Sequence, residues 1–241
     1  MYPYPLEQLT TASSLLLMNG NARRPMSTKT LLIGDPGSTH CGDVEIAHEL
    51  VRVGKECGLD MVKFQLFPND IRYTKCGNIP LDYSEFTDLV EYGNDLGICV
   101  FASVFNATAY KTVAKRCKAV KFSYKSCMST WIPQAVQDFK PDYVFVSGDV
   151  MNQPPEFVQR LYCIPEYPVR YKIDFDGIFS RFDGFSDHTL GVTQSIEAIR
   201  CGAKVIEKHY RLDRGECDKV PDGAFALKPR LLEKLAIGCG G

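Results

Sequence analysis

The chain has 241 residues, of which 45% are hydrophobic, and its formal net charge at pH 7 is −1. This length and apolar content suit one large domain or at most two small ones, and the near-neutral charge offers no electrostatic case for nucleic acid or an anionic membrane surface as a partner. No apolar run approaches the ~20 residues that a membrane span needs.

The first 29 residues do not read as a secretory leader, because Arg23 and Arg24 follow the short apolar stretch SSLLLM instead of preceding it. We therefore expect residues 1–29 to form an N-terminal appendage and residues 30–241 to form the main fold.

Short apolar runs alternate with amphipathic stretches from residue 30 onward. The apolar runs predict strands, and apolar residues spaced by three and four predict helices between them. Asp43 and Asn106 are expected N-caps. In chain order the expected strands are 30–35, 60–67, 98–105, 119–123, 142–148, 161–164, 182–187 and 203–210, and the expected helices are 43–58, 83–97, 106–117, 129–139, 190–202 and 228–237.

Repeated strand–helix units with buried strands predict an α/β fold with a parallel sheet. Eight such strands favour a closed (β/α)8 TIM barrel, whose usual size is ~250 residues. Two connectors are short, since residues 148–160 and 169–181 hold 13 residues each, and a parallel crossover with a full helix needs at least ~12. We expect a barrel trimmed in these connectors, after the fifth and sixth strands, with stunted or missing helices.

The ten cysteines include no CxxC pair, so a structural zinc site is not expected. Several of them lie in apolar runs, and the first 29 residues do not read as a secretory leader. The sequence therefore favours reduced cysteines that act as small hydrophobic residues in a cytoplasmic protein.

Polar side chains recur at the carboxyl ends of the predicted strands. Because side chains alternate along a strand with period two, Lys63 shares a face with Gln65, and Glu207 shares one with His209. In a parallel barrel these ends lie on one rim, where active sites are built. Buried there without ligand or partner, such groups would cost desolvation free energy. The set is Lys63, Gln65, Ser103, Lys121, Ser123, Ser147, Ser186, His188, Glu207 and His209.

The residue types in this set indicate two kinds of chemistry. Two lysines and several hydroxyls suit a phosphate or a carboxylate. His188 and His209 end successive strands, and two neutral imidazoles suit a divalent transition metal completed by oxygen ligands or water. Asp187 or Glu207 are candidates for orienting a histidine. The alternative for any single histidine is a buried core residue whose ring nitrogens are hydrogen-bonded. For His40, in the loop after the first strand, the sequence does not decide between a site residue and a core residue.

Five segments carry a resemblance to a known family: 33–65, CIPEYP at 163–168, GFSDHTLG at 184–191, GAKVIEKHYRLDR at 202–214 and PDGAFAL at 221–227. Together they resemble the sialic acid synthase family, which includes N-acetylneuraminate, legionaminate and pseudaminate synthases, over most of residues 30–236. The resemblance implies a barrel that condenses phosphoenolpyruvate with an N-acylated hexosamine of the N-acetylmannosamine type. The implied products are a nine-carbon 2-keto sugar acid and phosphate.

The resemblance also implies roles for individual residues. Lys63 and Lys121 match the lysines that bind phosphoenolpyruvate, and Asp35 stands where the family has a catalytic glutamate. His188 and His209 match histidines that hold a divalent metal, usually Mn²⁺ or Mg²⁺, so the implied catalytic set is Asp35, Lys63, Lys121 and His188. The implied substrate-binding residues are Ser103, Ser147 and Ser186 toward phosphoenolpyruvate and Gln65, Tyr167 and Asp222 toward the sugar.

Some positions depart from the family pattern. After Lys121 the family usually has a small residue, then Ser-Gly and an acid, whereas this chain has Ser123, Tyr124, Lys125 and Ser126, of which Lys125 offers a substitute cation. Pro165 replaces a polar residue before EYP. The chain stops at Gly241, so we expect the family's C-terminal antifreeze-like domain to be absent; a homodimer is a possible assembly. Two hypotheses stay open: an active synthase, and a degenerate barrel that binds a phosphorylated ligand or a partner without turnover. A phosphoenolpyruvate aldol-type synthase acting on a sugar phosphate has less support, since it lacks the SDHTLG match.

Overall fold

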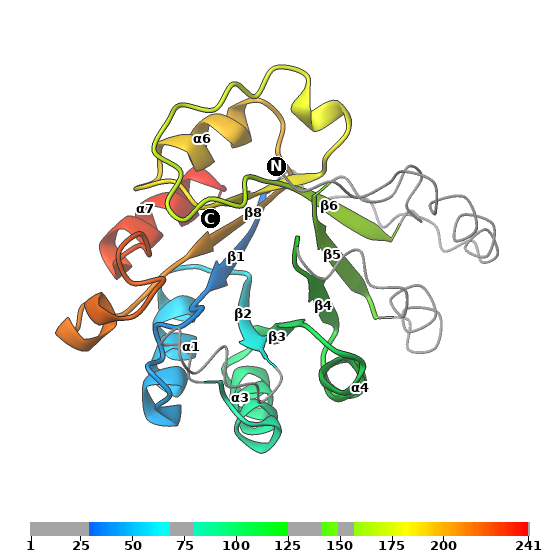
Figure 1. Ribbon diagram of the computed structural model, residues 1–241, viewed down its shortest axis with the longest axis vertical. Helices are drawn as coiled ribbons and strands as arrows, with labels where there is room; N and C mark the ends of the chain where they lie inside the picture. The colour runs from blue at the N-terminus through cyan, green and yellow to red at the C-terminus, as the bar shows by residue number, and fades with distance from the viewer. Residues whose placement is uncertain (1–28, 68–79, 125–140, 149–156, 241) are drawn as a thin grey trace, which may run out of the picture.

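The protein forms a closed barrel of eight parallel strands, seen in a computed structural model that describes residues 29–67, 80–124, 141–148 and 157–240 (Figure 1). Each strand pairs with the next in chain order, and β8 closes the ring on β1. This confirms the predicted TIM barrel. The strands are β1 (Leu31–Asp35), β2 (Met61–Leu66), β3 (Cys99–Val104), β4 (Ala119–Phe122), β5 (Tyr143–Ser147), β6 (Val158–Cys163), β7 (Gly184–Asp187) and β8 (Val205–His209).

Helices lie outside the ring of strands (Figure 1). The predicted caps are confirmed, because the Asp43 carboxylate accepts hydrogen bonds from the first backbone N–H groups of α1 and the Asn106 side chain accepts one from Ala109 in α4. None of the described helices combines the length and the apolarity needed to cross a membrane. The helices are α1 (Val44–Glu56), α3 (Tyr83–Leu96), α4 (Ala107–Arg116), α6 (Thr193–Arg200) and α7 (Pro229–Gly238), with 3-10 turns η2 (Ile178–Ser180) and η3 (Gly215–Lys219).

The connectors follow the expectation where they are described. Between β6 and β7 the only helical element is the three-residue turn η2, so the outer helix there is stunted as predicted. β6 begins at Val158, earlier than the predicted start at 161, because residues 158–161 pair with β5. The expected appendage (apart from Lys29), the expected helix at 129–139 and residues 149–156 of the other short connector lie outside the described residues.

Each strand divides its side chains between the barrel interior and the helices. Phe122 of β4 packs outward against Tyr110 of α4, with ring centroids 5.9 Å apart. Inside the barrel, Phe101 and Phe145 approach to 5.7 Å between centroids. These two rings are the register partners of Lys63 and Lys121 on the neighbouring strands. Both lysines therefore point inward beside apolar rings, where an ammonium group needs a partner.

Eight cysteines fall in the described part of the chain, and all eight are free thiols. Burial raises the pKa of the Cys117 thiol to about 12. This agrees with the expectation of reduced cysteines that serve as small apolar residues. Cys76 and Cys127 lie outside the described residues.

Candidate active site

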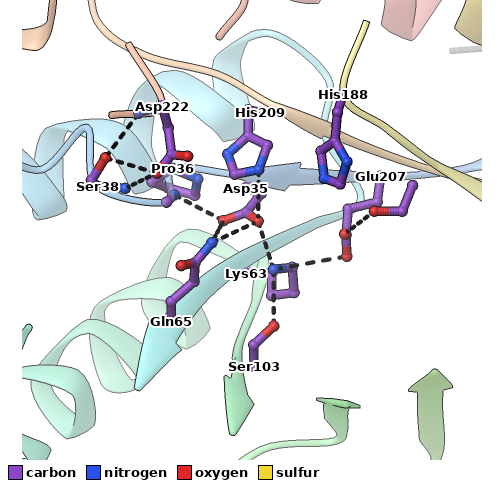
Figure 2. Close-up of polar contacts among 12 residues, drawn as sticks. Asp35, Pro36, Ser38, Lys63, Gln65, Ser103, His188, Glu207, His209 and Asp222 are labelled. Atoms are coloured by element: carbon purple, nitrogen blue, oxygen red, sulfur yellow. Dashed lines mark hydrogen bonds and ion pairs between the residues drawn. The ribbon is translucent and has the colours of Figure 1, made fainter. Parts of the chain in front are cut away.

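Four buried charged side chains from four strands meet inside the barrel. The Lys63 ammonium lies 2.7 Å from Oδ2 of Asp35, and the Lys121 ammonium lies 2.8 and 2.7 Å from the two carboxylate oxygens of Glu207. A distance of 3.8 Å from Lys63 Nζ to Glu207 Oε2 joins the two pairs. Figure 2 shows Lys63 between Asp35, Ser103 and Glu207. Two cations and two anions thus form one continuous network.

Mutual attraction keeps this network charged despite its burial. Burial by itself would raise the pKa of both carboxyls, yet Lys121 and Lys63 hold the pKa of Glu207 well below its usual range. His209 and Lys63 likewise lower the pKa of Asp35. Burial lowers the pKa of Lys121, whereas Asp35 and Glu207 overcome the same effect at Lys63 and raise its pKa. Removing any one member would leave a buried charge without compensation.

The three predicted serines line the same interior. Ser103 Oγ accepts a hydrogen bond from Lys63 at 3.0 Å, and Ser186 Oγ donates one to Glu207 Oε1 at 2.7 Å. Ser147, at the end of β5, is buried, and it acts to lower the pKa of the Cys163 thiol, which burial raises to about 11. The Cys163 sulfur also lies 4.0 Å from Nδ1 of His188. The sequence predicted no site role for Cys163, yet it lies among the site residues.

His188 and His209 lie next to each other, with ring centroids 5.7 Å apart, and point into the space above Asp35 and Lys63 (Figure 2). Nδ1 of His188 is 3.0 Å from the Ile164 carbonyl oxygen, which can only accept, so Nδ1 carries the proton and Nε2 keeps a lone pair. His209 has Nε2 3.5 Å from Asp35 Oδ2, and its buried Nδ1 has no hydrogen-bond partner among the described residues.

This imidazole pair fits a divalent metal in its donor chemistry. Burial, and then the neighbouring His209, lowers the pKa of His188 to about 4, so its ring is neutral at neutral pH, as a ligand must be. The described residues contain no group of three or more His, Cys, Asp or Glu side chains arranged to hold a metal ion. A metal on His188 and His209 would therefore complete its coordination with water or substrate oxygens.

The expectation that Asp187 or Glu207 orients a histidine by direct contact is wrong. Side-chain alternation turns Asp187 to the outside of the barrel, where it pairs with Lys208 at 3.0 Å. Glu207 does point inward, but its two oxygens are taken by Lys121 and Ser186. The Ile164 carbonyl orients His188 instead.

The residues predicted to face a sugar lie around the mouth of the site. Gln65 donates to Asp35 Oδ2 at 3.2 Å, which places it beside the charged network. Tyr167 is 58% exposed, and its ring lies over that of His188, with centroids 4.2 Å apart. Phe225, which the sequence did not single out, packs its ring 5.1 Å from that of His209. Aromatic surfaces thus flank both histidines, which suits a ligand with an apolar face.

Asp222 joins the loop after β8 to the loop after β1. Its Oδ2 accepts hydrogen bonds from both the backbone N–H and the hydroxyl of Ser38, each at 2.7 Å (Figure 2). A Cβ on Gly37 would lie 2.4 Å from the same oxygen, and Gly37 has φ of +55°, so only glycine permits this approach. Ser38 was not among the sequence candidates; it holds Asp222 in place.

Tyr124 and Pro165, which depart from the family pattern, lie at the rim. Tyr124 is 47% exposed, and its ring packs against Gly148, where a Cβ would come within 2.8 Å of a ring carbon. The ring therefore covers the end of β5 beside Ser147. Pro165 is exposed, and Lys125 lies outside the described residues.

Comparisons with known proteins find similar sequences and similar folds. The NeuB family is matched by residues 155–239. An uncharacterized protein of Methanocaldococcus jannaschii is 28% identical over 88% of this chain and 73% of its own. The N,N'-diacetyllegionaminic acid synthase of Legionella pneumophila is 28% identical over 90% of this chain and 73% of its own. In fold, the chain is similar to the N-acetylneuraminic acid synthetase of Leptospira borgpetersenii, with a TM-score of 0.74 and 20% identity over 88% of this chain and 83% of that one.

Proposed function

We propose that this sialic acid synthase-like chain, which carries the NeuB family match, condenses phosphoenolpyruvate with an N-acylated hexosamine of the N-acetylmannosamine type. The products would be a nine-carbon 2-keto sugar acid and phosphate, which makes the protein a transferase that forms a carbon–carbon bond. The observation that carries the proposal is the meeting of two lysines and two imidazoles in one buried site, Lys63 with Lys121 and His188 with His209.

Phosphoenolpyruvate carries a phosphate and a carboxylate, and the site offers donors for both. Lys63 and Lys121 are the cations, and hydroxyls of Ser103, Ser147 and Ser186 lie among them. Asp35 and Glu207 neutralise the two lysines. The ligand's anionic groups would share or replace these contacts, so the carboxylates keep the lysines charged and oriented before binding.

The reaction joins C3 of phosphoenolpyruvate to the aldehyde carbon of the open-chain sugar, with water adding at C2 and phosphate leaving by C–O cleavage. A divalent metal, Mn²⁺ or Mg²⁺, held by His188 and His209 would supply Lewis acidity toward the aldehyde oxygen. Asp35 contacts Lys63 and lies 3.5 Å from His209, which suits it to orient the water or move its proton. Gln65, Tyr167 and Asp222 surround the entrance, on the side from which the sugar would approach.

A second candidate is a barrel that binds a phosphorylated ligand or a partner without turnover. The position of Tyr124 favours it, because its ring covers the rim beside Ser147. Binding would still use Lys63 and Lys121, so the two candidates differ in turnover and not in affinity for phosphoenolpyruvate.

Phosphate release from phosphoenolpyruvate, with N-acetylmannosamine and Mn²⁺, tests the proposal. Release should require the sugar and should be lost in Lys121→Met. Lys118→Met is the matched control, since Lys118 is exposed just before the same strand and the chemical change is identical. Binding of phosphoenolpyruvate that depends on Lys121, with no phosphate released for any N-acylhexosamine, would overturn the synthase in favour of the binding protein.

A further inference from the structure

A second buried charge cluster lies on the outer side of the barrel, directly behind the two histidines. Asp187 of β7 and Lys208 of β8 are register partners, and both side chains point outward toward α6. Asp187, Lys208 and Ser195 of α6 have 0% exposure. We call these three residues, together with Thr189, the Lys208 cluster.

The contacts of the Lys208 cluster converge on the chain around His188. Asp187 accepts hydrogen bonds from the Thr189 backbone N–H at 2.7 Å and from the Ser195 hydroxyl at 2.5 Å. The Lys208 ammonium lies 3.0 Å from Asp187 and donates to the Thr189 carbonyl oxygen at 2.5 Å. Both backbone polar groups of Thr189 are thus held, so His188 lies between two fixed neighbours.

The same lysine immediately precedes His209. Because side chains alternate along β8, the outward direction of Lys208 requires His209 to point inward, and the same relation holds for Asp187 and Ser186 on β7. One ammonium group therefore ties the backbone that carries His209 to the backbone that carries His188.

Stability alone does not account for such a pair. Burial lowers the pKa of Lys208, which records the cost of taking its charge out of water, and Asp187 offsets only part of that effect. A buried ion pair is often no more stabilising than apolar side chains of similar size. Its distinctive effect is geometric, since the ammonium selects one position for the Thr189 carbonyl.

We propose that Lys208 and Asp187 are positioning residues, which set the separation and direction of His188 and His209 from the outer side of the barrel and so prepare the pair for a divalent metal ion. This rests on the proposed function in one respect, that the two histidines take a metal. Neither residue touches the ligand site itself. Partners behind metal ligands typically change metal affinity by about 10–100-fold when they are removed.

Mn²⁺ binding to the metal-stripped protein, followed by electron paramagnetic resonance, tests this inference without relying on activity. Lys208→Met keeps most of the side-chain volume and removes the ammonium, so its Kd for Mn²⁺ should rise by about 10–100-fold. Ser195→Ala leaves the ion pair intact and removes one hydrogen bond, so it should weaken binding in the same direction by less. The matched control is Thr30→Val, which removes a buried hydrogen bond to Ala203, just before the opposite end of β8; its Kd should match the wild type.

Circular dichroism and thermal unfolding establish which variants are folded. If Lys208→Met does not fold, Ser195→Ala decides the question. Suppose that the wild type binds Mn²⁺ and His188→Ala does not. Wild-type affinity for Mn²⁺ in the folded variants would then overturn the positioning role and leave the metal site standing. No Mn²⁺ binding by the wild type, or unchanged binding in His188→Ala, would instead overturn the metal site and this inference together.

Discussion

The ammonium of Lys63 lies 2.7 Å from a carboxylate oxygen of Asp35, and each side chain is only 3% exposed. Asp35 stands where the resembling family has a glutamate, and the shorter side chain still reaches the lysine. Gln65 donates to the same oxygen at 3.2 Å. The aspartate therefore keeps Lys63 charged inside the barrel, whatever further part it takes in the reaction.

Lys63→Met should destabilise the protein by about 3–5 kcal/mol, because it leaves the Asp35 carboxylate buried without its cation. Urea unfolding measures this loss. The double variant Lys63→Met/Asp35→Leu removes both charges and should recover most of the stability. Neither variant should release phosphate from phosphoenolpyruvate. The double variant would then show that the loss of activity is not a consequence of lost stability. A single variant as stable as the wild type would contradict the pairing.

The sequence was sufficient to predict most of the strands and helices of the barrel. Apolar spacing and the Asp43 cap located α1 to within a residue or two, and the strand before it is where the run TLLIGD predicted. The start of β6 was missed because Gln159 and Arg160 interrupt the apolar pattern. That segment becomes a strand through pairing with β5 and through the Asp183 carboxylate that accepts from its Arg160 N–H, both of which are long-range contacts.

The sequence was sufficient to predict which residues gather at the site, but not which of them form ion pairs with one another. Period-two alternation correctly predicted that the side chains of Lys63, His188 and His209 point into the barrel interior. It could not tell that Glu207 would pair with Lys121, which is 86 positions away and lies across the barrel. Closeness in sequence was misleading for Asp187, since the neighbour of an inward residue on a strand points outward.

His40 should make stability depend on pH. It is buried, and burial lowers its pKa from 6.5 to about 4 even though Asp222 and Asp35 act in the opposite direction. Between these values the unfolded chain binds more protons than the folded one. The free energy of unfolding should therefore rise with pH through this window and fall as pH drops from about 6.5 toward 4.

His40→Gln isolates this contribution. In urea unfolding with a metal chelator present, the wild type should lose more stability between pH 7 and pH 5 than the variant does, by roughly 1–2 kcal/mol. Other titrating groups, including His188, are common to both proteins and cancel in the comparison. Equal losses would mean that His40 is not held neutral by burial.

The hydrogen bonds from Ser38 to Asp222 should affect KM for the N-acylhexosamine and leave the affinity for Mn²⁺ unchanged. Asp222→Ala should raise KM for the N-acylhexosamine by roughly tenfold or more, as expected for the loss of a hydrogen bond to a charged group. Ser38→Ala, which removes one of two donors to Asp222 Oδ2, should cause a smaller rise in the same direction. Steady-state kinetics measure both, with KM for phosphoenolpyruvate and Mn²⁺ affinity as internal controls. A change confined to those controls would contradict this assignment.

Crystals soaked with Mn²⁺ and phosphoenolpyruvate, with diffraction recorded at the manganese absorption edge, test the central claim most directly. The anomalous peak should lie within bonding distance of a ring nitrogen of both His188 and His209, and the anionic groups of phosphoenolpyruvate should contact Lys63 and Lys121. A manganese peak away from either histidine, or phosphoenolpyruvate bound away from both lysines, would contradict it.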